Sequence, residues 1–180
     1  MDTGRLNEET YLCAESLRRQ LGIKIEWYFP KVDAVQQLES KKGVYSFKES
    51  LEARTECCGI RKVEPLNRAL YRLIAWITGM RREQCITRTQ LQTVEKDELH
   101  RGITKINPLA DWKTDEVWAY IKKHNLPSNR LYDTGYQSIG CAPCTRAVQP
   151  GEDSRAGRWW WEGPEHKECG LHIGKKGVKH

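Results

Sequence analysis

Hydrophobic and polar positions over the first 30 residues predict a helix followed by a strand. In the helical segment Glu8–Leu21, the apolar residues Leu12 and Leu17 stand among charged residues, and Gly22 follows as a typical helix C-terminus. Residues Ile23–Phe29 then alternate in polarity and are rich in β-branched and aromatic side chains, which is the pattern of a strand. These residues therefore predict one α/β step.

The same alternation of helices and strands continues through the middle of the chain. Thr114 is a good N-cap for a helix that ends before Leu126 and Pro127. Two short apolar segments have the character of strands in the core of a parallel sheet. Further helices are expected at residues 32–42, 47–53, 66–74 and 114–124, and further strands at residues 76–78 and 103–106.

Strands that alternate with helices favour an α/β fold with a doubly wound, mainly parallel sheet. We expect one domain over residues 1–180, because this length suits a single core. No glycine-rich phosphate loop follows a first strand, and the chain opens in the middle of an α/β pattern. From Pro127 onward the sequence is dense in Gly, Pro, Asn and Asp. A functional loop region or a poorly ordered one is expected there, with residues 163–180 as a mobile C-terminal segment.

Composition excludes some classes of protein and leaves others open. Seven Trp and seven Tyr argue against disorder. No run of residues approaches the roughly 20 apolar residues that cross a bilayer. The acidic start of the chain is not a signal peptide, so a cytoplasmic protein is expected. The formal charge of +6 is compatible with binding of nucleic acid, binding of an anionic metabolite or a solvated basic surface.

The spacing of the seven cysteines indicates metal binding or thiol chemistry rather than disulfides. Cys57 is followed directly by Cys58, and Cys141 and Cys144 form a C-x-x-C pair. Zinc sites use two C-x-x-C pairs around one ion, whereas an iron-sulfur cube presents separate corners that adjacent cysteines can bind. The spacing favours a four-iron cluster over zinc. The alternative is that the first pair consists of ordinary buried residues and the second is a redox pair.

Other single residues carry weaker signals. In a helix that begins at Cys58, Lys62 lies one turn on, where its charge could face both a cluster and an anionic ligand. A solvated surface lysine is the alternative. Cys13 is expected in the core, and Cys85 has no partner by spacing. Cys169 lies near the basic end, where cations and exposure favour a nucleophilic thiolate, although a cysteine there can also be idle.

Taken together, the motifs resemble those of the thioredoxin-dependent adenylylsulfate reductases of sulfate assimilation. The resemblance covers nearly the whole chain, and the two cysteine pairs with a terminal Cys-Gly-Leu-His form a highly specific combination. The matching segments are DTGRL (2–6), CCGIRKV (57–63), WITGMRREQ (76–84), LYDTGY (131–136), SIGCAPCTR (138–146), GRWWWE (157–162) and ECGLH (168–172).

The resemblance implies a fold related to that of the ATP pyrophosphatases, among the adenine nucleotide alpha hydrolases. It implies that Cys169, on a flexible C-terminal segment, attacks the sulfur of adenylylsulfate, expels AMP and becomes an S-sulfocysteine. Thioredoxin or glutaredoxin would then release sulfite. A [4Fe-4S] cluster without net redox activity would be held by Cys57, Cys58, Cys141 and Cys144. The phosphate and sulfate of the substrate would be held by Lys62, Arg88, Arg155 and Arg158, and arginine forks suit such oxyanions.

The sequence also departs from the family. The family's first strand and phosphate loop have no counterpart before Met1, so an N-terminally truncated domain is expected, and an inactive fragment is one alternative. Phosphoadenylylsulfate reductase is another, although members that use that substrate usually lack the cysteine pairs. A basic nucleic-acid-binding module that carries zinc or a cluster is the alternative from another class. The oligomeric state is open, a homo-oligomer included. Trp160 and Trp161 are expected to anchor their loop in the core.

Overall fold

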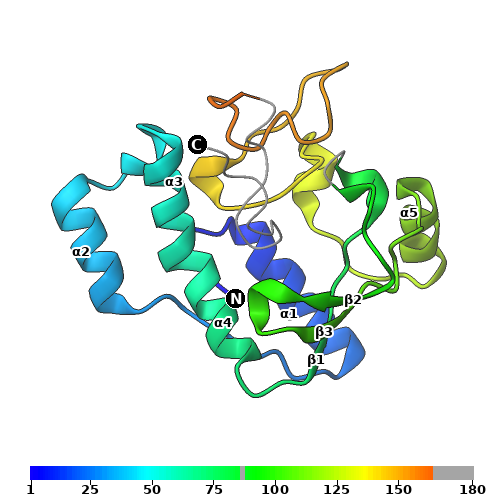
Figure 1. Cartoon of the computed structure of the whole chain (residues 1–180). Helices are drawn as coiled ribbons and strands as arrows, with labels where there is room; N and C mark the ends of the chain where they lie inside the picture. The colour runs from blue at the N-terminus through cyan, green and yellow to red at the C-terminus, as the bar shows by residue number, and fades with distance from the viewer. Residues whose placement is uncertain (86–87, 164–180) are drawn as a thin grey trace.

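The computed structural model describes residues 1–85 and 88–163 of the chain (Figure 1). Most helices come before the strands, and a long region of turns and short 3-10 helices follows the last helix. Within residues 1–85 and 88–163, no helix is long and apolar enough to cross a membrane. The helices are α1 (Glu8–Leu21), α2 (Val32–Lys42), α3 (Leu51–Cys58), α4 (Glu64–Leu70) and α5 (Thr114–Lys123), and the strands are β1 (Ala75–Ile77), β2 (Val94–Asp97) and β3 (Ile103–Ile106).

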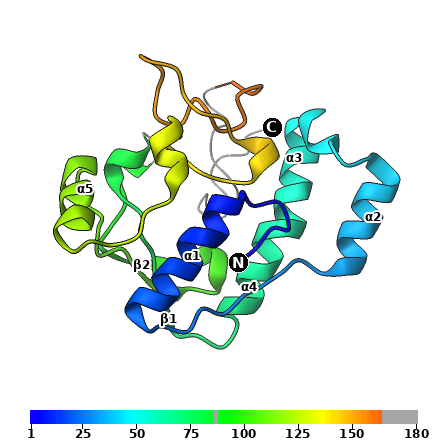
Figure 2. The ribbon, with the colours of Figure 1, turned by 180° about the vertical axis from the view of Figure 1, so that it is seen from behind.

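The first two helices, α1 and α2, have the predicted bounds. Gly22 adopts a φ of 62°, which costs glycine little, and ends α1. Glu8 and Glu9 in the first turn and Arg18 and Arg19 in the last turn complement the dipole of this helix. Figure 2 shows α1 in front of the strands, and Figure 1 shows α2 and α3 on one side of them and α5 on the other.

The strand predicted over Ile23–Phe29 is wrong, because the segment between α1 and α2 belongs to no sheet. The backbone N–H of Asp2 donates to the carbonyl of Tyr28 at 2.8 Å. Trp27 and Phe29 are exposed instead of packing on the face of a sheet. A strand needs a neighbouring strand to complete its hydrogen bonds, and among the described residues none pairs with this segment.

The sheet has the strand order β1–β3–β2. β3 is parallel to β1, with Ala75 opposite Thr104 and Ile77 opposite Ile106. β3 is antiparallel to β2, with Val94 opposite Ile106. The α/β class and the two predicted strands are confirmed, but the sheet is mixed. Ile77 on the edge strand β1 is 71% exposed.

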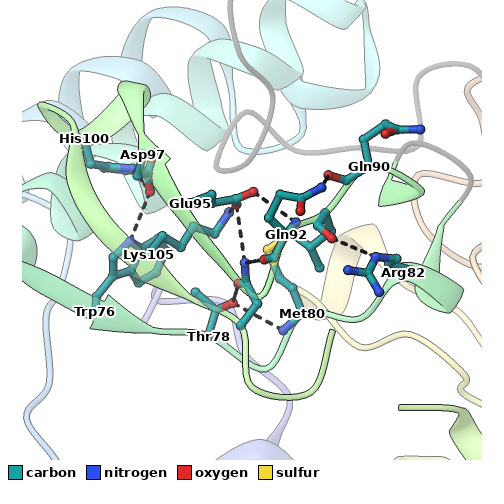
Figure 3. A network of polar contacts seen from close by, with 12 residues as sticks. Trp76, Thr78, Met80, Arg82, Gln90, Gln92, Glu95, Asp97, His100 and Lys105 are labelled. Atoms are coloured by element: carbon teal, nitrogen blue, oxygen red, sulfur yellow. Dashed lines mark hydrogen bonds and ion pairs between the residues drawn. The ribbon is translucent and has the colours of Figure 1, made fainter. Parts of the chain in front are cut away.

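Three of the four residues of β2 are charged, which is why the hydrophobic pattern does not predict this strand. Asp97 is buried, accepts a hydrogen bond from Trp76 Nε1 at 3.1 Å and lies 2.9 Å from His100 Nδ1 (Figure 3). Glu95 pairs with the buried Lys105 at 2.9 Å. Polar side chains here satisfy one another across neighbouring strands, so their burial needs no apolar pattern.

The first cysteine pair ends a helix instead of beginning one. The helix expected over residues 47–53 divides into a 3-10 turn over Ser46–Lys48 and the start of α3. Ser50 caps α3, and its hydroxyl accepts a hydrogen bond from a backbone N–H at 3.1 Å. Cys57 and Cys58 form the last turn of α3, so the expected helix start at Cys58 is wrong.

The backbone does not break after the cysteine pair. Gly59 keeps a right-handed helical conformation, and a π-helical turn over Gly59–Val63 leads directly into α4. Lys62 therefore still lies one turn beyond Cys58, as the sequence indicates. It is buried in this turn, so the interpretation as a solvated surface lysine is wrong.

The later helices differ from their predicted bounds at the ends. α4 begins and ends earlier than expected, whereas α5 ends one residue before the predicted end. Lys113 rather than Thr114 occupies the cap position of α5. The N–H of Thr114 donates instead to the carboxylate of Glu83 at 2.6 Å, so a residue distant in sequence supplies the acceptor.

The largest fully buried side chain belongs to Trp159, which is 0% exposed. It shares a core cluster with Phe47, Leu38 and the four paired cysteines. Trp160 is 39% exposed, so its predicted anchoring role is wrong. Trp161 is partly buried against this cluster, with its ring 5.9 Å from that of Phe47, as expected of an anchor.

We predict that Phe47→Ala lowers the free energy of unfolding by about 3–5 kcal/mol, because Phe47 is 1% exposed and its loss leaves a cavity. Urea denaturation would measure the change. Tyr45→Ala is the matched control, since Tyr45 is 62% exposed and should cost less than about 1 kcal/mol. Equal losses in the two variants would contradict the assigned core.

Candidate active site

Four cysteines from two distant segments surround one small cavity. Cys57 and Cys58 come from α3, and Cys141 and Cys144 come from the 3-10 turn that follows residue 140. All four are buried. The cavity is lined by Arg5, Phe47, Arg54, Cys57, Cys58, Arg61, Lys62, Cys141 and Cys144. The fold thus brings together the four predicted ligands, and it places Lys62 among them.

The N-terminal residues hold the C-x-x-C turn in place. Thr3 is buried, and its Oγ1 lies 3.2 Å from Cys141 Sγ. The backbone N–H of Ala142 donates to the carbonyl of Arg5 at 2.8 Å. Arg61 donates to the carbonyl of Thr3 at 2.7 Å and so ties the same segment to the π-helical turn. Residues 2–5, which no local pattern connects with the cysteines, contact both the C-x-x-C turn and the π-helical turn, and Arg5 lines the cavity.

Buried cations surround the thiols. Arg61 and Arg5 both pair with the carboxylate of Glu39 on α2. Arg54 pairs with Glu162 at 2.6 Å, and both side chains are almost fully buried. Buried charges of one sign raise the free energy of the fold unless anions accompany them. The carboxylates of Glu39 and Glu162 supply part of that compensation within the described residues.

The cations and hydrogen bonds shift the pKa values of the thiols in different directions. The pKa of Cys141 is lowered, chiefly by a hydrogen bond from the thiol of Cys144, with further help from Lys62. That same hydrogen bond, together with burial, raises the pKa of Cys144. Burial also raises the pKa of Cys57, and nearby Arg61 opposes this effect. The cavity therefore favours a thiolate at Cys141, the form in which cysteine binds a metal.

Trp159 links the cysteine cavity to the residues beyond it. Its backbone N–H donates to the carbonyl of Cys144 at 3.0 Å. Its ring contacts three cations, with centroid distances of 4.4 Å to Arg54, 4.6 Å to Arg158 and 5.7 Å to Lys62. A single buried indole therefore orders side chains from α3, from the π-helical turn and from the loop after α5.

A separate cleft of about 1020 Å³ lies beside this cavity. One part of its wall is apolar and aromatic, with Trp118 and Tyr132 in edge-to-face contact at 5.1 Å. Four arginines also line it, namely Arg81, Arg88, Arg155 and Arg158, together with neutral polar residues and the two acidic residues Glu83 and Asp133. Arginine forks suit phosphate and sulfate groups, so this wall favours an anionic ligand.

Arg158 lies at the boundary between cleft and cysteines. Its guanidinium lies 3.2 Å from the carbonyl of Ile139 and 3.4 Å from Ser138 Oγ. A Cβ at Gly140 would lie 2.6 Å from this guanidinium, so any larger residue there would displace the end of the Arg158 side chain. Arg155 lies 3.5 Å from the same hydroxyl of Ser138. The loop that precedes the C-x-x-C turn therefore sets both arginines.

Arg81 was missed as a candidate ligand for anions. Its guanidinium donates to Thr114 Oγ1 at 3.0 Å, and its buried Nε has no hydrogen-bond partner among the described residues. Arg88 Nη1 donates to Gln84 Oε1 at 2.7 Å, and the same oxygen accepts from the backbone N–H of Arg81 at 3.2 Å. The doublet Arg81-Arg82 in the sequence could have indicated a cationic loop after the strand.

The structure places the remaining candidates as follows. Lys62 lines the cysteine cavity and not the arginine-lined cleft, which receives the three predicted arginines. Cys13 lines the cleft and is only partly buried, so its predicted place in the core is wrong. Cys85 is partly buried. Cys169 and the segment expected to be mobile lie outside the described residues from position 164 onward.

The donor set of the cysteine cavity consists of soft thiols, which suit zinc or an iron-sulfur cluster. Within residues 1–85 and 88–163, no group of three or more His, Cys, Asp or Glu side chains is arranged to hold a single metal ion. The four thiols nevertheless line one buried cavity that is surrounded by cations. This environment fits a bound group with net negative charge.

Comparison with known proteins gives the same family for sequence and fold. Residues 1–147 match the phosphoadenosine phosphosulfate reductase domain. Adenosine 5'-phosphosulfate reductase of Burkholderia cepacia is 56% identical over 96% of this chain and 69% of its own length. The enzyme of the same name from Allochromatium vinosum is 54% identical over 96% of this chain and 67% of its own length.

Plant and fungal proteins extend the comparison. The chloroplastic 5'-adenylylsulfate reductase 3 of Arabidopsis thaliana is 47% identical over 97% of this chain and 39% of its own length. The crystal structure of phosphoadenylyl-sulfate reductase from Candida auris, a phosphate complex, superposes with a TM-score of 0.64 and 31% identity. That match covers 80% of this chain and 67% of the fungal one. The chain therefore belongs to the family of phosphoadenosine phosphosulfate and adenosine 5'-phosphosulfate reductases, enzymes that act on sulfur groups.

Proposed function

We propose that this protein reduces adenylylsulfate to sulfite and AMP with electrons from thioredoxin or glutaredoxin. The observation that carries the proposal is the arginine-lined cleft joined through Arg158 and Trp159 to a buried cavity of four cysteines. An anionic substrate fits the cleft, and the names of the bacterial relatives supply its identity. Because these thiol reductants are found in the cytosol, the proposal includes a cytoplasmic location for this protein.

In this proposal, cations in and near the cleft bind the phosphate and sulfate of the substrate. Arg88, Arg155 and Arg158 are its predicted anion ligands, and Arg81 joins them from the loop after β1. Lys62 contributes from the side of the cysteines, across the ring of Trp159. Such cations also offset the repulsion between an attacking thiolate and an anionic sulfate group.

A [4Fe-4S] cluster suits the cysteine cavity. Cys57, Cys58, Cys141 and Cys144 would hold it, and its net negative charge would offset the surrounding cations without a net redox change. Arg61 and Lys62, held in the π-helical turn, keep positive charge next to these thiols. The described side chains thus supply both the donor atoms and the electrostatic compensation that such a group requires.

The chemistry is assigned to Cys169, which follows the described residues. Its thiolate attacks the sulfur of the sulfate group, an S–S bond forms, and the bond from sulfur to the phosphate oxygen breaks. AMP leaves with that oxygen, and the enzyme carries an S-sulfocysteine. A reductant thiolate then attacks Cys169 Sγ and expels sulfite, and the second thiol of the reductant resolves the mixed disulfide. Two electrons from the dithiol thus appear in sulfite.

A second candidate function is the reduction of phosphoadenylylsulfate. The observation in its favour is the structural similarity to the fungal reductase of that name. This substrate carries one more phosphate group. The same cleft would then also have to neutralise that group. Reactions run in parallel with the two substrates would separate the candidates.

We expect one sulfite adduct on Cys169 when anaerobically prepared protein meets adenylylsulfate without a reductant. The S-sulfocysteine accumulates because no thiol is present to release sulfite. Intact mass spectrometry followed by peptide mapping measures it. Cys85→Ser should keep the adduct, and Cys169→Ser should lose it. An adduct that persists in Cys169→Ser would rule out this nucleophile.

Cys58→Ala should lose most of its iron and acid-labile sulfide, because one corner of the cluster is left without a thiolate. Iron and sulfide assays on anaerobically purified protein measure the content. Cys13→Ala is the matched control, since Cys13 lies in the cleft and not in the cysteine cavity. Iron retained at the original content in Cys58→Ala would refute the proposed ligand set.

Arg158→Gln should weaken the binding of adenylylsulfate about tenfold or more, because a charge-assisted hydrogen bond contributes about 1.5–3 kcal/mol. Isothermal titration calorimetry on cluster-loaded protein gives the dissociation constant. Arg68→Gln serves as the control, since Arg68 is exposed on α4 and pairs with Glu64 at 3.2 Å. Equal affinities in both variants would remove Arg158 from the substrate site.

A further inference from the structure

We propose that Asn107 is a positioning residue that fixes the Arg81 and Arg88 wall of the cleft. It lies directly after β3, away from the cysteine cavity, and none of the sequence motifs singled it out. The identity of the ligand in this inference rests on the function proposed above. The assignment of Asn107 rests on hydrogen bonds and burial alone.

Asn107 occupies the edge of the sheet where ligands of α/β proteins bind. The parallel strands β1 and β3 end side by side at Ile77 and Ile106. The backbone N–H of Thr78 donates to the carbonyl of Ile106 at 2.9 Å, so the pairing continues one residue further. In α/β sheets, ligands lie beyond the carboxyl ends of the strands. Thr78 and Asn107 are the first residues beyond these two ends.

The side chain of Asn107 is 0% exposed and forms hydrogen bonds at both ends of its amide. Its Nδ2 donates to the carbonyl of Gln92 at 2.7 Å and lies 3.4 Å from Glu95 Oε1. Its Oδ1 accepts a hydrogen bond from the hydroxyl of Thr78. The amide therefore joins the segment that follows β1 to the segment that precedes β2.

The backbone of Asn107 binds the same two regions. Its N–H donates to the carbonyl of Thr93 at 2.7 Å, and its carbonyl accepts from the N–H of Ala110 at 3.0 Å. The carbonyl of Ala110 in turn accepts from the backbone N–H of Arg82 at 2.9 Å. Side chain and backbone together thus hold the residues after β1 and before β2 to the end of β3.

Both regions lead directly to arginines of the cleft. In the region after β1, the N–H of Met80 lies 3.4 Å from the hydroxyl of Thr78, and Arg81 is the next residue. In the region before β2, the N–H of Leu91 donates to the carbonyl of Arg88 at 2.9 Å. The Nε of Arg82 donates to the carbonyl of Leu91 at 2.7 Å and so connects these two regions.

Only an amide meets the two demands at this position. An aspartate would keep the acceptor for Thr78 but could not donate to the carbonyl of Gln92, and its charge would face Glu95. An alanine would leave the hydroxyl and the carbonyl without their partner in a dry region, which is costly. Loss of the amide should therefore let the loops that carry Arg81 and Arg88 move apart.

The far end of the same polar network provides a matched control. Trp76 Nε1 donates to the buried carboxylate of Asp97 at 3.1 Å, and Asp97 pairs with Ile103 at the start of β3, the opposite end of that strand from Asn107 (Figure 3). Trp76→Phe removes this hydrogen bond and should cost similar stability. Trp76 is not among the residues that line the cleft.

The test compares ligand affinity with stability in Asn107→Asp, Thr78→Val and Trp76→Phe. Cluster-loaded protein is titrated calorimetrically with adenylylsulfate and with inorganic pyrophosphate, and thermal unfolding is followed in parallel. Asn107→Asp should weaken both ligands about tenfold, because misplaced cations lose alignment with the oxyanion. Thr78→Val should weaken both by a smaller factor. Trp76→Phe should keep the original affinities at a comparable loss in melting temperature.

The two probes separate this inference from the proposed substrate. Weakened pyrophosphate binding in Asn107→Asp would support the positioning role. If the unchanged protein also failed to bind adenylylsulfate, the proposed substrate would be refuted while the positioning role stood. Unchanged affinities in Asn107→Asp and Thr78→Val would overturn the positioning role. The same conclusion would follow if Trp76→Phe weakened binding as much as Asn107→Asp, because general loss of stability would then explain both.

Discussion

The structure depends on how a concentration of buried positive charge is held next to four thiols. Arg54, Arg61, Lys62 and Arg158 are all buried, and their mutual repulsion requires anions close by. Glu39 and Glu162 supply two, from α2 and from the end of the described chain. An anionic cluster and an anionic substrate, as proposed, would complete the compensation. Binding and folding are thereby coupled, since each anion that binds stabilises the arrangement that receives it.

Trp159 connects the cations around the cysteine cavity with an arginine of the cleft. A flat, apolar ring between cations tolerates positive charge on its faces, as cation–π contacts do, and excludes water. Arg158 lines the cleft, and its charge also helps to lower the pKa of Cys141 in the cysteine cavity. A change in charge at the thiols would therefore act electrostatically on the cleft that is proposed to bind the anion. The loop after α5 has little regular structure, yet this buried anchor makes it a defined part of the site.

The sheet contributes through its carboxyl edge. Only three short strands are present in the described residues, and their role is to set the starting points of the loops. Asn107 illustrates the principle, because a fully buried amide can connect two loops more rigidly than exposed contacts would. Loops held in this way combine the chemical variety of irregular structure with the fixed geometry that recognition of phosphate and sulfate requires.

Local patterns suffice to predict the helix over Glu8–Leu21, the α/β class and the two cysteine pairs, because periodicity and ligand spacing are properties of neighbouring residues. The three-dimensional fold was needed to show that Ile23–Phe29 is no strand, since pairing requires a partner that no local pattern contains. It also decided that Trp159 and not Trp160 is the buried anchor, and that Arg81 lines the cleft. Burial and long-range hydrogen bonds depend on which distant segments meet, and that information is distributed over the whole chain.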